Sequence, residues 1–371
     1  MLETIKWNGY KLLVKNHGLL FLAIAAALML LGVLLPININ QYKGNPATAE
    51  RVEEYYQAYG GGLDQEMVNR IEEKKAEIEG AVREQEALFA AFDSGEITVA
   101  ELEKGLKEVT PLVHQQSAFR EFYSSYLYCK EDPDQRHLVD VKGWRPLLDL
   151  KEPDFLLMFC VVIVSALLCG ADLRQRIRPV LHTTVHGFAH DLYSKWVLIA
   201  FMAVALGLIF QLMTMGKYGL YFSYQEGNAP IQSIAAYAQC SASLSVWQTF
   251  LSGSCIRMFG LVYVGIVTVC AMELSGSASK GGLLSLAVVV VPYFAGYRDS
   301  VYLNWPAPAG LVQAYMYLAG NPAGNDVNPI TLSTLARVVL MASTIMVLLG
   351  VVTWRFTRPG RGILKKRSKR K

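Results

Sequence analysis

Residues 18–36 read GLLFLAIAAALMLLGVLLP, an apolar run of nineteen residues without a charge. As a helix this run is about 30 Å long, which matches the hydrocarbon core of a bilayer. The lysines that precede it also occur before the apolar core of a signal peptide. That core is usually only about 7–15 residues long, and here no small-x-small cleavage site follows. We therefore predict a membrane-spanning helix that stays in the protein.

Five further stretches are apolar enough to cross a membrane as helices. They are Phe155–Gly170, Trp196–Met215, Met258–Met272, Leu283–Tyr297 and Val338–Trp354. Of the 371 residues, 53% are hydrophobic and only 18% are charged, against about 25% charged in soluble proteins. This composition excludes a disordered chain, a collagen, a coiled-coil fibre and a small disulfide scaffold. It predicts an all-α polytopic membrane protein with six transmembrane helices.

Basic residues near the ends of these stretches predict the side on which each loop lies. Three lysines precede residue 18, four basic side chains lie between the second and third stretches, and nine follow the last one. Because basic loops stay in the cytoplasm, we expect both termini there and residues 37–153 outside. For the basic tail the same position favours contact with anionic membrane lipids over nucleic acid.

The charge distribution separates an acidic insert from a basic membrane body. Residues 37–153 carry 23 acidic and 14 basic side chains, whereas the rest of the chain carries 8 and 21. The predicted parts are a cytoplasmic interfacial helix at 1–17, a first span at 18–36, an extracellular helical domain at 37–153, a second span at 154–171, a cytoplasmic coupling loop at 172–195, spans three to six with their extracellular loops at 196–357, and a basic cytoplasmic tail at 358–371.

The first fifteen residues have the pattern of an amphipathic helix. Four polar residues form one narrow stripe at about 100° per residue: Thr4, Asn8, Lys11 and Lys15. A helix of this kind can lie in the plane of the lipid headgroups, where Trp7 and Tyr10 would act as interfacial anchors. The simpler alternative is a positively charged flank for the first span.

The insert has the periodicity of helices. Apolar residues recur at three-, four- and seven-residue steps between residues 67 and 92, which indicates an amphipathic helix. Asp93-Ser94-Gly95 predicts a turn, and Thr98 with Glu101 predicts a capping box that begins a second helix. At Thr110-Pro111 we predict a break and a restart, because proline suits the first position of a helix. The insert is expected to be a helical hairpin or a small bundle.

No catalytic or metal-binding motif is found in the sequence. A phosphate-binding P-loop, H-E-x-x-H, C-x-x-C and G-x-S-x-G are all missing, so we expect a non-catalytic chain without its own cofactor or metal. His182, His186 and His190 would share one helical face, but they would spread over about 12 Å, too far to bind one ion together. A polar cytoplasmic helix is the preferred interpretation of these histidines.

The predicted spans contain essentially no carboxylate or histidine, which argues against an ion-driven carrier. Arg257 and Arg337 lie near predicted outer ends, where we expect their side chains to extend to the interface. Only Cys129 and Cys240 fall in segments predicted to lie outside, so one disulfide between them is conceivable.

Residues 170–196 are the most informative part of the sequence. Asp172 follows the second span, then come three arginines and a Leu-His-Thr-Thr segment, and Lys195 opens the third span. This arrangement resembles the cytosolic loop of bacterial ABC type-2 permeases, with Phe188 where that family has an arginine. Residues 229–248 resemble the outer loop of a Gram-positive subgroup that has a large helical insert between its first two spans.

The resemblance implies a half-transporter that pairs with a second permease, the same chain or a sister chain, and with separate cytosolic ABC ATPase subunits that bind ATP and Mg²⁺. The residues that it assigns to ATPase coupling are Arg174, Arg176, Arg178, Leu181, His182, Thr183, Thr184 and Gly187. It predicts ATP-driven export of an amphipathic peptide or lipid-like cargo by alternating access, in the bacterial plasma membrane. The arginines are explained equally well as charges that orient the spans.

A second hypothesis is a membrane sensor or scaffold whose extracellular helical domain binds a peptide or a partner in the cell envelope. A third is a membrane enzyme that acts on lipid, although the sequence contains no recognisable catalytic set. ATP hydrolysis by a co-purified complex would separate the first hypothesis from the other two.

Overall fold

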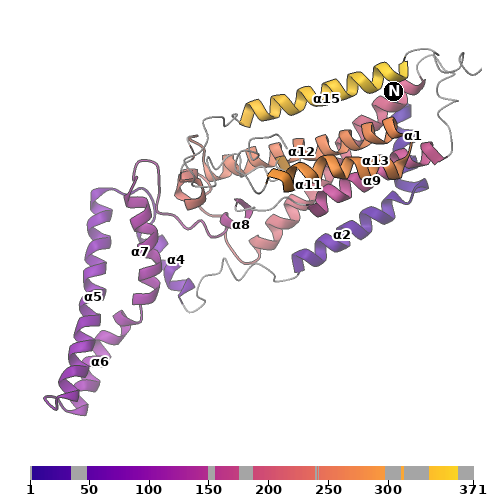
Figure 1. Cartoon of the computed structure of the whole chain (residues 1–371). Coiled ribbons are helices and arrows are strands. Elements are labelled where there is room, and N and C mark those ends of the chain that lie inside the picture. Colours follow the sequence, from indigo (N-terminus) through magenta and orange to yellow (C-terminus); the bar gives the residue numbers. More distant parts are fainter. Residues whose placement is uncertain are drawn as a thin grey trace, which may run out of the picture. The chain divides into compact units, whose positions relative to one another are not determined.

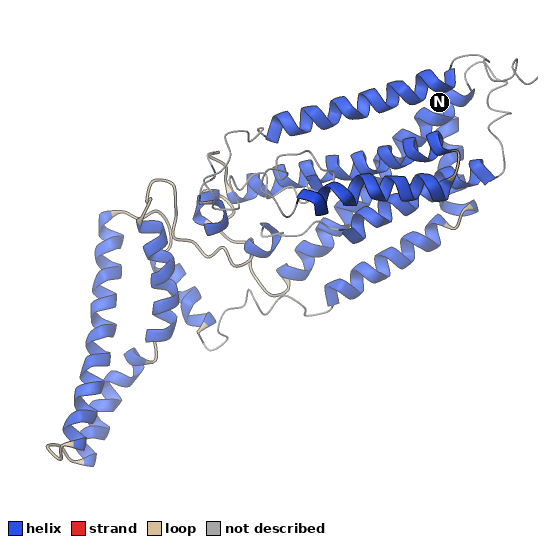
Figure 2. Cartoon of the chain, in the orientation of Figure 1, coloured by secondary structure: helices blue, strands red, loops and turns tan. Residues whose placement is uncertain are grey.

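The computed structural model describes residues 2–34, 48–148, 155–174, 187–238, 240, 242–296, 311–312 and 334–357. Throughout these residues the regular secondary structure is helical, and the β-type pairings are two isolated bridges (Figure 2). The predicted all-α class is therefore confirmed for the described part of the chain.

The chain divides into two compact units. The apolar unit comprises Met1–Leu35, Leu150–Lys217 and Phe250–Lys371, and the polar unit comprises Pro36–Asp149 and Tyr218–Thr249. The polar unit thus combines most of the predicted insert with the segment between the third and fourth apolar stretches.

A helix forms at each of the six apolar stretches. These helices are α2 (Gly18–Leu34), α9 (Phe155–Arg174), α11 (Gly187–Gly219), α12 (Val246–Ser275), α13 (Ala278–Gly296) and α15 (Thr334–Thr357), and α1 (Leu2–Tyr10) precedes them (Figure 1). Among the described residues, two helical segments, Ala189–Gly219 and Val246–Ser275, are long and apolar enough to cross a membrane. The apolar segments of the other four helices have 10–17 residues. A membrane protein is supported, and the number of six spans stays a prediction.

Helices α9, α11 and α12 share one apolar core. Leu168 of α9, Ile199 of α11 and Val264 of α12 are all buried in it. Gly265 of α12 permits close packing, because a β-carbon at this position would collide with the side chain of Ile199. Small residues at such contacts are typical of helices that associate within a membrane, where van der Waals packing drives association.

Four helices of the insert form the body of the polar unit. They are α4 (Ala49–Tyr59), α5 (Gln65–Asp93), α6 (Val99–Val113) and α7 (Gln116–Lys130), followed by the short α8 (Arg145–Leu148) and, in the second segment, the 3₁₀ helices η2 (Ile231–Ser233) and η3 (Ala235–Tyr237). The rings of Tyr55 on α4 and Phe122 on α7 stack with their centroids 5.5 Å apart. Ile71 and Ile78 of α5 pack into the same buried cluster. The predicted helical bundle is therefore present.

The helix ends of the insert agree with the sequence at the first turn and differ at the second. Helix α5 ends at Asp93, and the predicted capping box of Thr98 and Glu101 begins α6. The position of the predicted break at Thr110-Pro111 is wrong, because α6 continues through Pro111 to Val113, and the helix restarts as α7 at Gln116. Proline removes only one backbone hydrogen bond here, and the N–H of His114 still donates to the carbonyl oxygen of Thr110 at 2.9 Å.

Residues 218–249 pack onto the insert within the polar unit. The hydroxyl of Tyr128 donates a hydrogen bond to the carbonyl oxygen of Gln232 at 2.7 Å. The buried Tyr237 donates to the carbonyl oxygen of Leu148 at 2.8 Å. Two segments that the charge pattern predicts on the same side of the membrane therefore form one folded unit.

Cys129 and Cys240 are separate, buried thiols of this unit. The Cys129 thiol donates to the carbonyl oxygen of His137 at 3.3 Å, and the Cys240 thiol lies 3.9 Å from that of Ala242. The disulfide considered from the sequence is not formed.

Candidate functional site

A group of buried charges joins four helical segments of the apolar unit. Its members are Lys11, Asp172, Asp191, Lys195 and Glu273, and we name it the ion cluster. No member is more than 8% exposed. They come from α9, α11, α12 and the π-helical turn η1 (Lys11–Lys15), which directly follows α1. Charged side chains are almost never buried so deeply unless they are paired, and buried ionisable groups often mark functional sites.

Lys195 is the centre of the ion cluster. Its Nζ lies 3.0 Å from Oδ2 of Asp172, 2.7 Å from Oδ2 of Asp191 and 3.3 Å from Oε1 of Glu273. Asp191 precedes Lys195 by four residues on α11, so one helical turn holds these two side chains together. Asp172 and Glu273 belong to α9 and α12. One ammonium group therefore links three apolar helices.

The N-terminal segment adds a second cation and an amide. Lys11 Nζ lies 2.9 Å from Oδ1 of Asp172. Asn8, which is fully buried, donates from Nδ2 to Oδ1 of Asp191 at 3.0 Å and to Oγ of Ser194 at 2.6 Å. Two residues of the predicted polar stripe are thus directed at carboxylates inside the protein.

The aromatic residues of α1 are exposed. Trp7 and Tyr10 are 54% and 52% exposed, and their rings stack with the centroids 5.8 Å apart. An outward aromatic pair on a segment that directs Asn8 and Lys11 into the protein suits a helix that rests on lipid. The role of the pair as interfacial anchors stays a prediction.

The ion cluster stabilises one arrangement of the four helical segments, because its buried charges are favourable only while they stay paired. Transferring one charge from water to a protein interior costs several kcal/mol, and attraction between charges offsets this cost only in good geometry. All four segments must therefore be in place together. Separating one member would leave a buried charge poorly paired, which favours two discrete helix arrangements over gradual deformation.

The residues assigned to ATPase coupling border the ion cluster in the sequence. Arg174 is the last residue of α9 and Gly187 is the first of α11. The remaining six lie outside the described residues: Arg176, Arg178, Leu181, His182, Thr183 and Thr184. Asp172 and Asp191 stand just before and just after this loop, and both contact Lys195. The two ends of the loop are therefore held at one ammonium group.

The ion cluster is not predicted by the sequence patterns described above. Asp172 follows the second apolar stretch by two residues, Lys195 directly precedes the third, and Glu273 directly follows the fourth. The apolar stretches themselves lack carboxylates, as expected, but the helices continue past them and bury the charges at their ends. The sequence feature that could have predicted the ion cluster is the repeated placement of a charge at the border of an apolar run.

The Arg257 side chain is buried in the protein, which differs from the expectation that it extends outward. It is 2% exposed on α12, and its Nη1 donates to Oε1 of Gln211 on α11 at 3.2 Å. Its guanidinium carbon lies 5.1 Å from the ring centroid of Phe210. The side chain stays inside because α11 offers both an amide oxygen and an aromatic face, which attracts a cation. The side chain of Arg337 lies outside the described residues.

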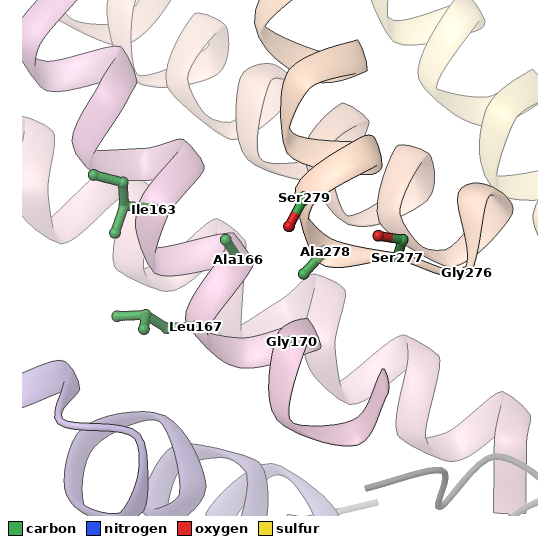
Figure 3. A pocket seen from close by; sticks show the side chains of 8 residues that line it. All are labelled: Ile163, Ala166, Leu167, Gly170, Gly276, Ser277, Ala278 and Ser279. Carbon is green, nitrogen blue, oxygen red and sulfur yellow. The ribbon is translucent and has the colours of Figure 1, made fainter. Parts of the chain in front are cut away.

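A cavity of about 460 Å³ lies between α9 and the turn that joins α12 to α13 (Figure 3). Its lining consists of Ile163, Ala166, Leu167, Gly170, Gly276, Ser277, Ala278 and Ser279. Two hydroxyl groups are the polar side-chain groups of this lining, and it contains no carboxylate, histidine or cysteine. The cavity therefore offers no acid–base or nucleophilic pair for catalysis.

In the part of the chain that the structure describes, no group of three or more His, Cys, Asp or Glu residues is arranged to hold a metal ion. The three carboxylates of the ion cluster converge on an ammonium group. Of the predicted histidine trio, His190 is described and lies exposed on α11, whereas His182 and His186 lie outside the described residues. The expectation of a chain without a metal or catalytic set stays a prediction.

Comparison with protein-family models, curated proteins and solved structures finds no match to this chain. The similarity to ABC type-2 permeases therefore rests on the residues of the loop and of the outer segment alone.

Proposed function

We propose that this chain is the permease subunit of an ATP-driven ABC exporter in the bacterial plasma membrane. In this proposal six helices cross the membrane, both termini are cytoplasmic, and the cargo is an amphipathic peptide or a lipid-like molecule. A second permease, the same chain or a sister chain, completes the pathway. Separate cytosolic ATPase subunits bind ATP and Mg²⁺ and supply the energy.

The exposed apolar surface supports a membrane location. Phe201 and Leu212 of α11 are 67% and 66% exposed, and Met346 of α15 is 68% exposed. Large apolar side chains at such exposure are costly in water and favourable in lipid. Two helices of sufficient length and hydropathy add to this support.

The observation that carries the proposal is the ion cluster at Lys195. Because Asp172 and Asp191 contact the same ammonium group, α9 and α11 are joined at both ends of residues 175–186. An ATPase that pushes on this loop would tilt both helices together, and Glu273 would pass the movement to α12. Such rigid-body motion of packed helices is a known route to alternating states.

The polar unit supports the orientation of the spans. Residues 216–247 are predicted outside because they contain a single lysine, and residues 37–153 because the first span leads out of the basic N-terminal segment. They also fold together, as the hydrogen bond from Tyr128 to Gln232 illustrates. Contact between two segments requires that they share one side of the membrane.

The test is purification of the tagged chain from gently solubilised native membranes, with assay of Mg-ATP hydrolysis and identification of what co-purifies. We expect a stoichiometric ATPase subunit. The double variant Thr183→Glu and Thr184→Glu should release this subunit, because it places two carboxylates at the predicted contact. Lys280→Glu, an exposed position after the α12–α13 turn, is the matched control and should retain it.

A sensor or scaffold is the second candidate, and the observation that favours it is the folded polar unit with its own aromatic core. Recovery of the chain without an ATPase in several detergents would favour this candidate and contradict the exporter.

A further inference from the structure

The turn end of the α5–α6 hairpin carries exposed apolar side chains among acidic residues. Phe89 and Phe92 of α5 and Val99 of α6 are 46%, 36% and 65% exposed. Residues 84–103 include all three, and they contain six carboxylates but no lysine or arginine. We name residues 84–103 the hairpin tip.

A close contact between Leu88 and Gly105 holds the two helices of the hairpin together beside the exposed aromatic residues. Leu88 of α5 packs on Gly105 of α6 so closely that a β-carbon at Gly105 would collide with the Leu88 side chain. Phe89 and Phe92 are three residues apart and therefore neighbours on the helix surface. Large apolar side chains that are left together at a surface indicate an interaction site.

The carboxylates of the hairpin tip are mostly available to a partner. Glu101 accepts hydrogen bonds from the backbone N–H and the hydroxyl of Thr98, both at 2.8 Å, and so serves the helix start. The other five are exposed: Glu84, Glu86, Asp93, Glu96 and Glu103. Such a surface attracts cations over roughly a Debye length, about 8–10 Å at physiological salt.

The negative charge of the hairpin tip indicates which class of partner can bind there. An anionic lipid surface would be repelled by the hairpin tip, and so would the same tip of a second copy. A segment with lysine or arginine beside an apolar face complements both the carboxylates and the exposed rings. We propose that the hairpin tip binds a cationic amphipathic peptide. This binding concerns the polar unit and is independent of the proposed transport function.

The test uses the full chain in nanodiscs of zwitterionic phosphatidylcholine and three fluorescent 18-residue probe peptides. The first has leucine and lysine at helical spacing, the second replaces lysine by glutamate, and the third replaces leucine by serine. Fluorescence anisotropy should show binding of the leucine–lysine peptide alone, weaker at higher salt. Equal binding of the leucine–glutamate peptide would overturn the proposal.

Matched variants locate the site. Glu84→Gln, Glu86→Gln and Glu96→Gln together should weaken binding about tenfold, because three charge contacts are lost at once. The control removes three exposed carboxylates elsewhere in the polar unit: Glu53→Gln, Glu66→Gln and Glu73→Gln. This control should bind within about twofold of the unchanged chain. An equal loss in both triple variants would show a general charge effect and contradict the proposal.

The apolar part is tested by Phe89→Ser with Phe92→Ser, which should weaken binding of the leucine–lysine peptide and leave the helical circular dichroism unchanged. If this variant loses helical structure, the charge variants still decide the question. Self-association through the hairpin tip, or its attachment to phosphatidylglycerol vesicles in place of the peptide, would also overturn the proposal.

Discussion

Lys195 is the residue on which the arrangement of α9, α11 and α12 depends most. Replacing it by methionine keeps the length of the side chain and removes the charge that faces Asp172, Asp191 and Glu273. Breaking a buried ion network in this way typically costs about 3–5 kcal/mol. We expect Lys195→Met to lower the melting temperature of the purified full chain by several degrees, as measured by intrinsic fluorescence.

The control for this prediction is Lys280→Met, because Lys280 is exposed and its charge should contribute little. The double variant Lys195→Met with Glu273→Gln should recover part of the loss, since one carboxylate is neutralised. Equal melting temperatures for Lys195→Met and Lys280→Met would contradict a stabilising role of the ion cluster.

Cys129 gives a residue-scale prediction about pH. Burial raises the pKa of this thiol to about 11, whereas a thiol in the unfolded chain has a pKa of about 8.5. At pH 8 only about one folded molecule in a thousand carries the thiolate, the form that reacts. N-ethylmaleimide should therefore leave Cys129 unmodified at pH 8 and modify it after unfolding in detergent, as read by mass spectrometry.

The raised pKa of Cys129 also determines the direction in which stability changes with pH. Because folding raises the pKa of Cys129, its contribution to stability is fully present below about pH 8.5 and declines as the pH rises toward 11. The exposed Cys255 is the internal reference for reagent activity. Peptides that link Cys129 to Cys240 by a disulfide would contradict the structure.

At the scale of single elements, hydropathy predicted the helices because each apolar run carries its own signal. The run at residues 18–36 becomes α2, Gly18–Leu34. The ion cluster left no such signal, since Lys11 and Asp172 are 161 positions apart and meet only through the packing of different helices. Pro111 shows a limit at short range, because the sequence predicted a break at this proline, whereas α6 ends two residues later at Val113 and α7 begins at Gln116.

The capping box of α6 is an element-scale test. Glu101 N–H donates to Oγ1 of Thr98 at 3.4 Å, and Glu101 accepts in return from the Thr98 N–H at 2.8 Å. Loss of an N-cap side chain costs about 1 kcal/mol, so Thr98→Ala should speed hydrogen exchange in the first turn of α6 about fivefold. Thr110→Ala, in the same helix, should leave that turn unchanged. Equal exchange in both variants would contradict a role for the cap.

At the scale of the whole molecule, three positions test whether the first four apolar helices cross the membrane. Lys6, Ser94 and Lys280 are all exposed, and each can be replaced by cysteine. Between residues 6 and 94 lies α2, and between residues 94 and 280 lie α9, α11 and α12. If every apolar helix crosses, Ser94 is on the opposite side of the membrane from the other two. If only α11 and α12 cross, all three positions share one side.

We expect an impermeant maleimide to label Ser94→Cys in intact cells, and to label Lys6→Cys and Lys280→Cys only after the membrane is opened. The reason is that three basic segments favour the cytoplasm at the N-terminus, between the second and third stretches, and at the tail. The unchanged chain, with its six native cysteines, provides the background. Labelling of all three variants from the same side would contradict a crossing by α2 and would leave α11 and α12 as the crossing helices among these four. If that shared side is the outer one, residues 175–186 lie there too, where a cytosolic ATPase cannot reach them.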